Sequence, residues 1–156
     1  MIYIAHRGLF NGPSKTSENH PNQIAKALKL GFHVEVDIWY VNKKLLLGHD
    51  EPKYPIDDNF IDPRKFWIHC KNVEALHYFA THISEKYNYF WHENDQYTLT
   101  SKDYIWTYPG KTLTDKSIMV MPEHTDYTLL NTKDVKCYGI CSDYVERIKA
   151  KNYEIN

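Results

Sequence analysis

Two acidic residues stand one residue apart in the segment HVEVDIWY, and their spacing points to a site for a cation. Residues i and i+2 of a strand face the same side, so Glu35 and Asp37 share one face. Val34, Val36 and Ile38 flank them, as in a buried strand, where two like charges repel each other and lose hydration. A hard divalent metal ion held by carboxylate oxygens compensates both costs. The alternative is a half-exposed strand on which both carboxylates face water.

Four basic side chains follow other apolar runs, at points where strands are expected to end. They are His6 and Arg7 in MIYIAHRG, His49 in LLLGHD and Lys71 in WIHCKN. In a parallel barrel the carboxyl ends of the strands share one face, so these groups are expected in one cup with the two carboxylates. Two histidines beside a metal site suit a general acid and a general base. Arg7 and Lys71 add fixed positive charge of the kind that binds phosphate oxygens.

The elements that must position these groups are mostly short strands. Apolar, aromatic and β-branched runs predict strands at Ile2–Ala5, Val34–Tyr40, Phe66–Cys70, Tyr87–Trp91, Tyr97–Leu99, Tyr104–Thr107, Ile118–Met121 and Tyr138–Cys141, with a hairpin arm through KKLLLGHD. Helical patterns are fewer. They cover HPNQIAKALKLG, the segment KNVEALHYFATHISEK with Asn72 as its N-cap and Ile83 on its apolar face, and YVERIKA.

The order of these elements predicts the fold class. Strand–helix–strand order at the start favours parallel pairing, and eight such strands favour a closed barrel. A full (β/α)8 barrel takes roughly 200–250 residues, whereas this chain has 156. We therefore expect one α/β domain over residues 1–156, a reduced TIM-type (β/α)8 barrel from which several outer helices are missing.

At this point the motifs resemble a known family. The ordered segments AHRG, SEN, VEVD and GHD resemble the catalytic signature of glycerophosphodiester phosphodiesterases, which belong to the phospholipase C-like phosphodiesterase barrels. This match covers Ile4 to Asp50, about a third of the chain. Two weaker similarities follow: YGICSDYVERI resembles the last strand of that family, and YIWTYPG resembles a Trp-Thr segment of a late strand.

The resemblance implies a shortened, metal-dependent phosphodiester hydrolase. The roles that it implies are acid–base catalysis for His6 and His49, metal binding for Glu35 and Asp37, and phosphate binding for Arg7 and Lys71. Glu18 in SENH is expected either to shape the site or to orient a residue that binds the metal. The attacking group is either water or a neighbouring hydroxyl of the substrate, and the second choice gives a cyclic phosphate first. The substrate is expected to be a small-molecule or lipid head-group phosphodiester.

The chain departs from this family in the third strand. The family commonly has an acidic metal ligand two residues before the lysine, and this chain has His69 before Lys71. His69 is therefore a further candidate ligand, and His92, Glu93 and Glu123 are alternatives that complete the shell in its place. The two carboxylates favour Mg²⁺ or Ca²⁺, whereas an imidazole ligand shifts the preference toward Mn²⁺, Co²⁺ or Zn²⁺.

Composition limits the partners. The formal net charge of -1 provides no general attraction to nucleic acid or to an anionic membrane. The three cysteines form no C-x-x-C pair, which predicts reduced thiols and a cytoplasmic protein. No apolar run is long enough for a transmembrane segment, and oligomeric state is left open.

Three other functions compete with the phosphodiesterase. One is a catalytically weak binder of phosphorylated small molecules, against which His6, His49, Glu35 and Asp37 argue. Another is a structural or interaction protein with solvated charges. The third is a metal-dependent amidohydrolase, which would want a His-x-His pair after the first strand, where this chain has AHRG.

Overall fold

The structure is a computed structural model that describes residues 1–82, 86–125 and 135–153. The strands in these residues are β1 (Ile2–Ala5), β2 (His33–Val41), β3 (Lys44–Leu47), β4 (Tyr54–Ile56), β5 (Phe66–Cys70), β6 (Asn88–Phe90), β7 (Tyr97–Leu99), β8 (Ile105–Thr107), β9 (Ser117–Val120) and β10 (Gly139–Ser142). The helices are α1 (Pro21–Lys29), α2 (Val73–His82) and α3 (Val145–Tyr153), with single 3-10 turns η1 (His6–Gly8), η2 (Asp58–Phe60) and η3 (Pro122–His124).

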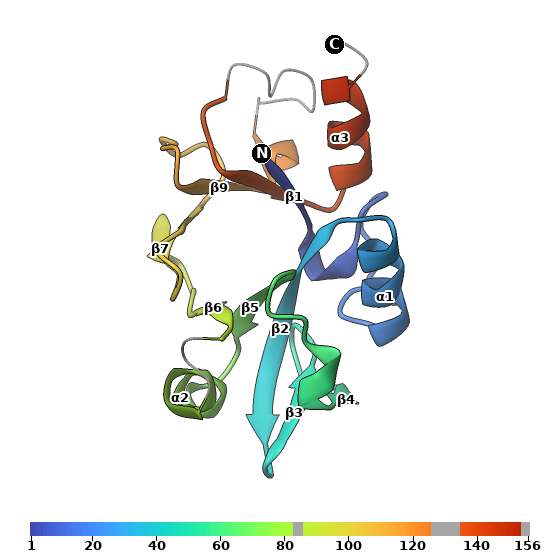
Figure 1. The fold of residues 1–156 in the computed structure, drawn as a ribbon, viewed down its shortest axis with the longest axis vertical. Coiled ribbons are helices and arrows are strands. Elements are labelled where there is room, and N and C mark those ends of the chain that lie inside the picture. The colour runs from blue at the N-terminus through green and yellow to red at the C-terminus, as the bar shows by residue number, and fades with distance from the viewer. Residues whose placement is uncertain (83–85, 126–134, 154–156) are drawn as a thin grey trace.

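All ten strands belong to one curled sheet (Figure 1). Seven of them run parallel in the order β6-β5-β2-β1-β10-β9-β8, which confirms the parallel pairing predicted for the first strands. The long strand β2 also pairs with β3 in an antiparallel hairpin, which β4 extends. The other end of the sheet turns back, because β7 pairs with β8 in the antiparallel sense.

The predicted reduced (β/α)8 barrel is wrong. The described residues form a mixed α/β half-barrel with three short helices, and a helix follows only β1, β5 and β10. A helical crossover between parallel strands needs about a dozen residues, and the segments 91–96, 100–104 and 108–116 fall short of that. In the described sheet β6 pairs with β5 alone and β7 with β8 alone, so no strand ladder joins β6 to β7.

The three helices pack on the outer side of the curled sheet, against the strands that carry most of the candidate residues. α1 packs on β2, α3 packs on β1 and β10, and α2 packs on β2, β5 and β6. Asn72 caps α2 as predicted, because its Oδ1 accepts from the Ala75 amide at 3.1 Å and from the Tyr40 amide at 3.0 Å. Ile83, predicted to lie on the face of this helix, is outside the described residues. Side chains of the three helices pack with those of β1, β2 and β5 in one hydrophobic core.

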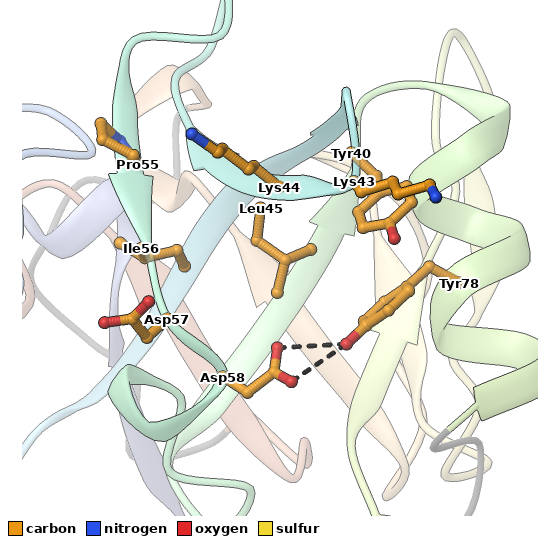
Figure 2. Close-up of a pocket in the computed structure, with 9 residues that line it drawn as sticks. All are labelled: Tyr40, Lys43, Lys44, Leu45, Pro55, Ile56, Asp57, Asp58 and Tyr78. Carbon is orange, nitrogen blue, oxygen red and sulfur yellow. Dashed lines mark hydrogen bonds between the residues drawn. The ribbon is translucent and has the colours of Figure 1, made fainter.

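The hairpin end of the sheet is joined to α2 by tyrosines (Figure 2). Tyr40 at the end of β2 stacks on Tyr78 of α2, with ring centroids 4.6 Å apart. The Tyr78 hydroxyl donates to the carboxylate of Asp58 in η2, with both oxygens 3.1 Å away. These side chains border a shallow cavity of about 510 Å³ on the outer face of the hairpin. None of the residues predicted to be functional lines this cavity.

The helices are also short with respect to a lipid bilayer. Within the described residues, no helix has the length and apolar character required to cross a membrane.

Candidate functional site

The eight residues singled out from the sequence line one cavity of about 810 Å³. They come from η1, the loop before α1, β2, the loop after β3, and β5 with the residue that follows it: His6, Arg7, Glu18, Glu35, Asp37, His49, His69 and Lys71. The parallel strands β1, β2 and β5 bring their carboxyl ends to the same edge of the sheet, which is why segments far apart in sequence meet here. His49 reaches the cavity differently, because it follows β3, which runs antiparallel to the long strand β2. The cavity does not require a complete ring of helices.

The paired carboxylates are buried, as one of the two sequence interpretations predicts. Glu35 is 2% exposed and Asp37 is 1% exposed, so the alternative of a half-exposed strand is wrong. Burial and the neighbouring Asp37 raise the pKa of Glu35 above its ordinary value. Burial acts in the same direction on Asp37, but the adjacent His69, Arg7 and Lys71 hold its pKa well below the usual range. An added cation would relieve the unfavourable charge on Glu35.

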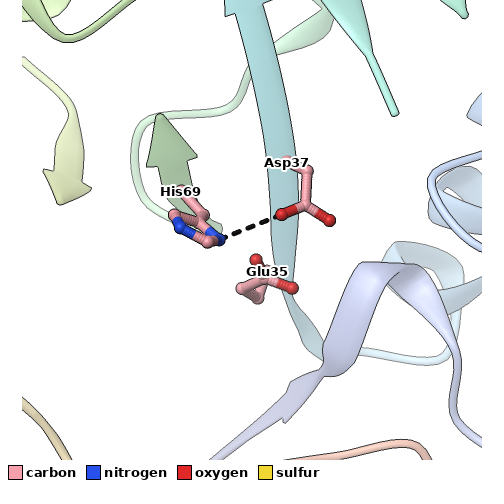
Figure 3. A group of neighbouring side chains, drawn as sticks. All are labelled: Glu35, Asp37 and His69. Carbon is pink, nitrogen blue, oxygen red and sulfur yellow. Dashed lines mark ion pairs between the residues drawn. The ribbon is translucent and has the colours of Figure 1, made fainter. Parts of the chain in front are cut away.

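Glu35, Asp37 and His69 form a group that a single ion could bridge (Figure 3). One ligand atom from each lies within 4.8 Å of the other two. His69 Nε2 contacts the backbone oxygen of His92 at 3.0 Å. Because a carbonyl oxygen only accepts, Nε2 carries a proton, so Nδ1 keeps its lone pair in a neutral ring and donates to Asp37 in a protonated one. Nδ1 lies 3.0 Å from Asp37 Oδ1, which is buried and lacks a hydrogen-bond partner among the described residues. Two acceptor atoms face each other there, so a proton or a metal ion belongs between them.

Arg7 is held in place by three carboxylates. Its backbone is in the left-handed region, with φ of 51°, and its amide donates to Glu35 Oε2 at 3.0 Å. One terminal guanidinium nitrogen donates to Glu18 Oε2 at 2.7 Å, and Nε lies 3.4 Å from Asp37 Oδ2. Glu18 thus holds the Arg7 side chain in position, and it is not part of the group formed by Glu35, Asp37 and His69. The cationic side chain is fixed beside the paired carboxylates before any substrate arrives.

His6 is oriented by the last strand of the sheet. Its Nδ1 donates to Asp143 Oδ1 at 2.8 Å, and its Nε2 lies 3.9 Å from Glu35 Oε2. Burial lowers the pKa of His6, but the hydrogen bond to Asp143 and the charge of Glu35 outweigh it and raise the pKa above the ordinary value. Glu123 accepts from the Asp143 amide at 3.1 Å and from the Ser142 hydroxyl, which fixes the loop that carries Asp143.

His49 and Lys71 complete the polar side of the cavity. His49 Nδ1 contacts the exposed Asp50 carboxylate at 2.6 Å. The preceding Gly48 has φ of 151°, its amide donates to the Asp37 backbone oxygen, and a Cβ there would lie 2.0 Å from the Glu51 oxygen. Only glycine fits that turn, which directs His49 to the cavity. Lys71 Nζ lies 3.6 Å from Asp37 Oδ1.

Part of the cavity lining is apolar. It contains Leu9, Trp106, Val120 and Met121, with Tyr108 at the exposed rim. Trp106 is only 5% exposed and belongs both to the core and to the lining of the cavity. The cavity therefore combines charged and apolar lining residues.

Neither Asn19 nor Asp143 was predicted from the sequence to belong to the site, although Asn19 contacts Asp37 and Asp143 contacts His6. The Asn19 side chain donates to Asp37 Oδ2 at 2.8 Å and accepts from the Asp37 amide at 3.0 Å. Asn19 lies next to Glu18 in SEN, so proximity to a motif residue was the available signal. Of the alternative ligands, His92 and Glu93 line the cavity, whereas Glu123 is engaged with Ser142 and Asp143.

Comparisons with protein-family models, curated proteins and solved structures found no match for this chain. Function is therefore inferred from the residues and their geometry.

Proposed function

We propose that the protein is a divalent-metal-dependent phosphodiesterase that cleaves a small or lipid-derived phosphodiester by acid–base catalysis at His6 and His49. One observation carries this proposal. The cavity that holds Glu35, Asp37 and His69 within reach of one ion also holds both histidines and two cationic side chains. Cleavage of a phosphodiester needs these three kinds of group together. A metal ion balances the negative charge, cationic side chains bind the phosphate oxygens, and an acid–base pair takes a proton from the attacking hydroxyl and gives one to the leaving oxygen.

The residues present fit a metal ion. Glu35, Asp37 and His69 would hold it, since Asp37 Oδ1 and His69 Nδ1 face each other and the buried oxygen lacks a hydrogen bond. When bound, the ion withdraws charge from a phosphoryl oxygen and so makes the phosphorus more electrophilic. The two carboxylates favour Mg²⁺ or Ca²⁺, and the imidazole adds affinity for Mn²⁺ or Zn²⁺.

Arg7 and Lys71 bind the phosphate in this proposal. Both lie beside Asp37, at 3.4 Å and 3.6 Å, so their charges are already positioned next to the metal group. Glu18 prevents Arg7 from swinging away, because their contact is 2.7 Å long. Groups held in place before binding lose little freedom when the substrate arrives, which favours the transition state.

The two histidines move the protons. His6 Nδ1 is bound to Asp143 and His49 Nδ1 to Asp50, so in each ring Nε2 is the atom left for catalysis. One Nε2 takes the proton of the attacking hydroxyl as the new P–O bond forms. The other gives a proton to the leaving oxygen as the old P–O bond breaks. Attack by water yields an alcohol and a phosphomonoester, and attack by a neighbouring hydroxyl of the substrate yields a cyclic phosphate.

The surroundings of the site suggest the substrate class and compartment. The apolar part of the lining, with Trp106 and Met121, suits a phosphodiester that carries an apolar part, including a lipid head group with its adjoining chain. The unpaired cysteines support a cytoplasmic location, and the net charge of -1 gives no reason to propose a nucleic-acid partner.

The experiment is a screen of phosphodiesters, including bis(p-nitrophenyl) phosphate and glycerophosphocholine, with Mg²⁺, Ca²⁺, Mn²⁺ or Zn²⁺ and with EDTA. Phosphorus NMR identifies the product as a monoester or a cyclic phosphate. We expect turnover that EDTA abolishes and added metal restores, with no turnover by Asp37→Asn. Turnover that persists in EDTA would contradict the metal requirement. Binding of phosphodiesters without turnover at any metal would favour the catalytically weak binder.

A further inference from the structure

Glu123 is an acidic residue beside the candidate site that belongs neither to the metal group nor to the cavity lining. It lies in η3, directly after β9, and the group formed by Glu35, Asp37 and His69 does not include it. Its near neighbour Met121 lines the cavity, whereas Glu123 itself does not. Any part that the Glu123 carboxylate plays in the site is therefore indirect.

The Glu123 carboxylate accepts hydrogen bonds from two donors at the end of β10. The Ser142 hydroxyl lies 2.9 Å and 2.8 Å from the two carboxylate oxygens, and the Asp143 amide donates to Oε1 at 3.1 Å. Ser142 is fully buried and Asp143 is only 7% exposed, so neither donor has free access to water. Without the carboxylate both donors would lose their partner, which costs free energy in a buried position.

The strand pairing explains why these hydrogen bonds matter for His6. β10 lies between β9, which leads into η3 and Glu123, and β1, which leads into His6. Ser142 stands opposite Ala5 in the parallel ladder, so the residues that follow them, Asp143 and His6, are neighbours. His6 Nδ1 donates to Asp143 Oδ1 at 2.8 Å. Glu123 is thus one residue removed from a candidate catalytic histidine.

The backbone of Asp143 is held on both sides. Its amide donates to Glu123, and its carbonyl oxygen accepts from the Gly12 amide at 2.8 Å. The turn that carries Glu123 is itself fixed to β10, because the Met121 amide donates to the Cys141 oxygen at 2.8 Å. Met121 has φ of 45°, a left-handed conformation that a residue with a side chain keeps only where its surroundings enforce it. Glu123 therefore presents its carboxylate to Asp143 from a well-defined position.

We propose that Glu123 is a positioning residue for His6, which it orients through Asp143. By holding the Asp143 backbone, Glu123 keeps the Asp143 carboxylate on His6 Nδ1. That hydrogen bond directs Nε2 of His6 toward Glu35 Oε2, which lies 3.9 Å away. A partner on one ring nitrogen sets both the tautomer and the orientation of a histidine. The inference rests on the proposed phosphodiesterase and deepens it, because it adds to the acid–base pair a residue that touches no substrate.

Nitrogen NMR of the labelled full chain tests the orientation and needs no turnover, because it shows which nitrogen of an imidazole ring carries the proton. The His6 signals are those that disappear in His6→Gln. At alkaline pH, where the ring is neutral, we expect the wild type to hold the proton on Nδ1 and Glu123→Ala to show a mixture of both tautomers. Glu123→Gln should restore the single tautomer, because its amide oxygen still accepts from Ser142 and Asp143.

Steady-state kinetics with glycerophosphocholine and the most effective metal ion tests the consequence for catalysis. Glu123→Ala should lower kcat by about 10-fold or more, because a displaced catalytic group acts less well. KM should stay within about twofold, since Arg7, Lys71 and the metal group are unchanged. Glu123→Gln should recover most of the lost kcat. The control, Glu74→Ala at an exposed position of α2, should match the wild type.

Thermal unfolding confirms that each variant is folded. If Glu123→Ala does not fold, Glu123→Asp takes its place, because it keeps the charge but reaches less far toward β10, and the same changes are expected. The inference is overturned if the folded variant keeps the single Nδ1 tautomer of His6, or if its kcat equals that of the wild type. If the wild type cleaves no phosphodiester, the proposed function fails, and the NMR spectra alone decide whether Glu123 orients His6.

Discussion

Asp37 shows how the site is built at the scale of single residues. Its Oδ2 accepts from Asn19, and its backbone amide donates back to the same side chain. Its Oδ1 faces His69 and Lys71 without accepting a hydrogen bond. One oxygen is thus committed to holding the carboxylate in position, while the other is left for a cation. A carboxylate with one oxygen held by a hydrogen bond and the other available to a cation is typical of a metal ligand that a neighbouring side chain orients.

The first residue-scale prediction concerns Asn19. Asn19→Ala removes both hydrogen bonds to Asp37 and should weaken metal binding by about 10–100-fold, since outer partners orient the ligand. Mn²⁺ affinity, measured by calorimetry, is the readout. Asn22→Ala, at an exposed position on α1, is the matched control and should leave the affinity unchanged. Equal Mn²⁺ affinity in the two variants would show that Asn19 does not support the metal site.

The second residue-scale prediction concerns His69, the proposed imidazole ligand. His69→Glu replaces a nitrogen with oxygen and should lower activation by Mn²⁺ and Zn²⁺ relative to Mg²⁺ and Ca²⁺. The ratio of turnover rates with the four metals is the measurement. His77→Glu, on the exposed side of α2, adds the same charge outside the cavity and should keep the wild-type ratio. A variant at His69 with full activity and an unchanged ratio would exclude it as a ligand.

At the scale of elements, tight turns at strand ends direct the functional side chains. η1 follows β1 with Arg7 in the left-handed region, and Gly48 follows β3 with φ of 151°. The 3-10 turn lets His6 reach Asp143 while the Arg7 amide reaches Glu35. Each turn is short and contains a residue with positive φ, a backbone conformation that residues with side chains rarely adopt. Few alternative conformations are therefore open to the backbone of either turn.

Gly48→Ala tests this use of strand ends. A Cβ at this position would meet the Glu51 backbone oxygen at 2.0 Å, and backbone atoms cannot move aside cheaply. We expect a loss of roughly 2–3 kcal/mol in unfolding free energy, because strain and displacement add. Gly31→Ala after α1 is the control: it also has positive φ, but no atom lies within 4 Å of its Cβ, so about 1 kcal/mol is expected. Chemical denaturation compares them, and equal losses would remove the steric argument.

The contact between α2 and η2 gives an alkaline pH dependence. Burial and the Asp58 carboxylate raise the pKa of Tyr78 to about 12. Between the ordinary value, about 10, and that value, the unfolded chain loses a proton that the folded chain keeps. Stability from Tyr78 is therefore present below pH 10 and is lost as the pH rises toward 12. Relative to Tyr78→Phe, the wild type should lose unfolding free energy over this interval in denaturation curves. If the unfolding free energies of the wild type and Tyr78→Phe changed equally over this pH interval, the raised pKa of Tyr78 would be contradicted.

At the scale of the molecule, a curled sheet suffices to gather the site without a full ring of helices. The carboxyl ends of β1, β2, β5 and β10 supply its central groups, and these strands are the best-covered part of the sheet. β8 and β9 contribute the apolar side chains of Trp106 and Val120. This asymmetry explains how a chain of 156 residues can hold a large cavity.

The sequence predicted the strands and the convergence of the eight site residues. Both predictions rest on a local pattern, an apolar run followed directly by polar groups. It did not predict β4, whose sequence YPI contains a proline and is too short to show alternation. The predicted closed barrel was also wrong, because the number of strands does not show whether the connections between them are long enough for parallel pairing. Asn19 escaped notice because a buried asparagine looks like any loop asparagine until its partner, Asp37, is known.

The most direct test of the central claim is the rate of glycerophosphocholine cleavage, whose alkoxide leaving group needs a proton, by the wild type, His6→Ala, His49→Ala and the double variant. Circular dichroism confirms that each is folded. We predict that either single change lowers turnover by about 10²-fold or more, because each histidine moves a proton in the transition state. The double change should be far less than additively worse, since the two serve one cycle. Near-normal turnover in both single variants would contradict the account.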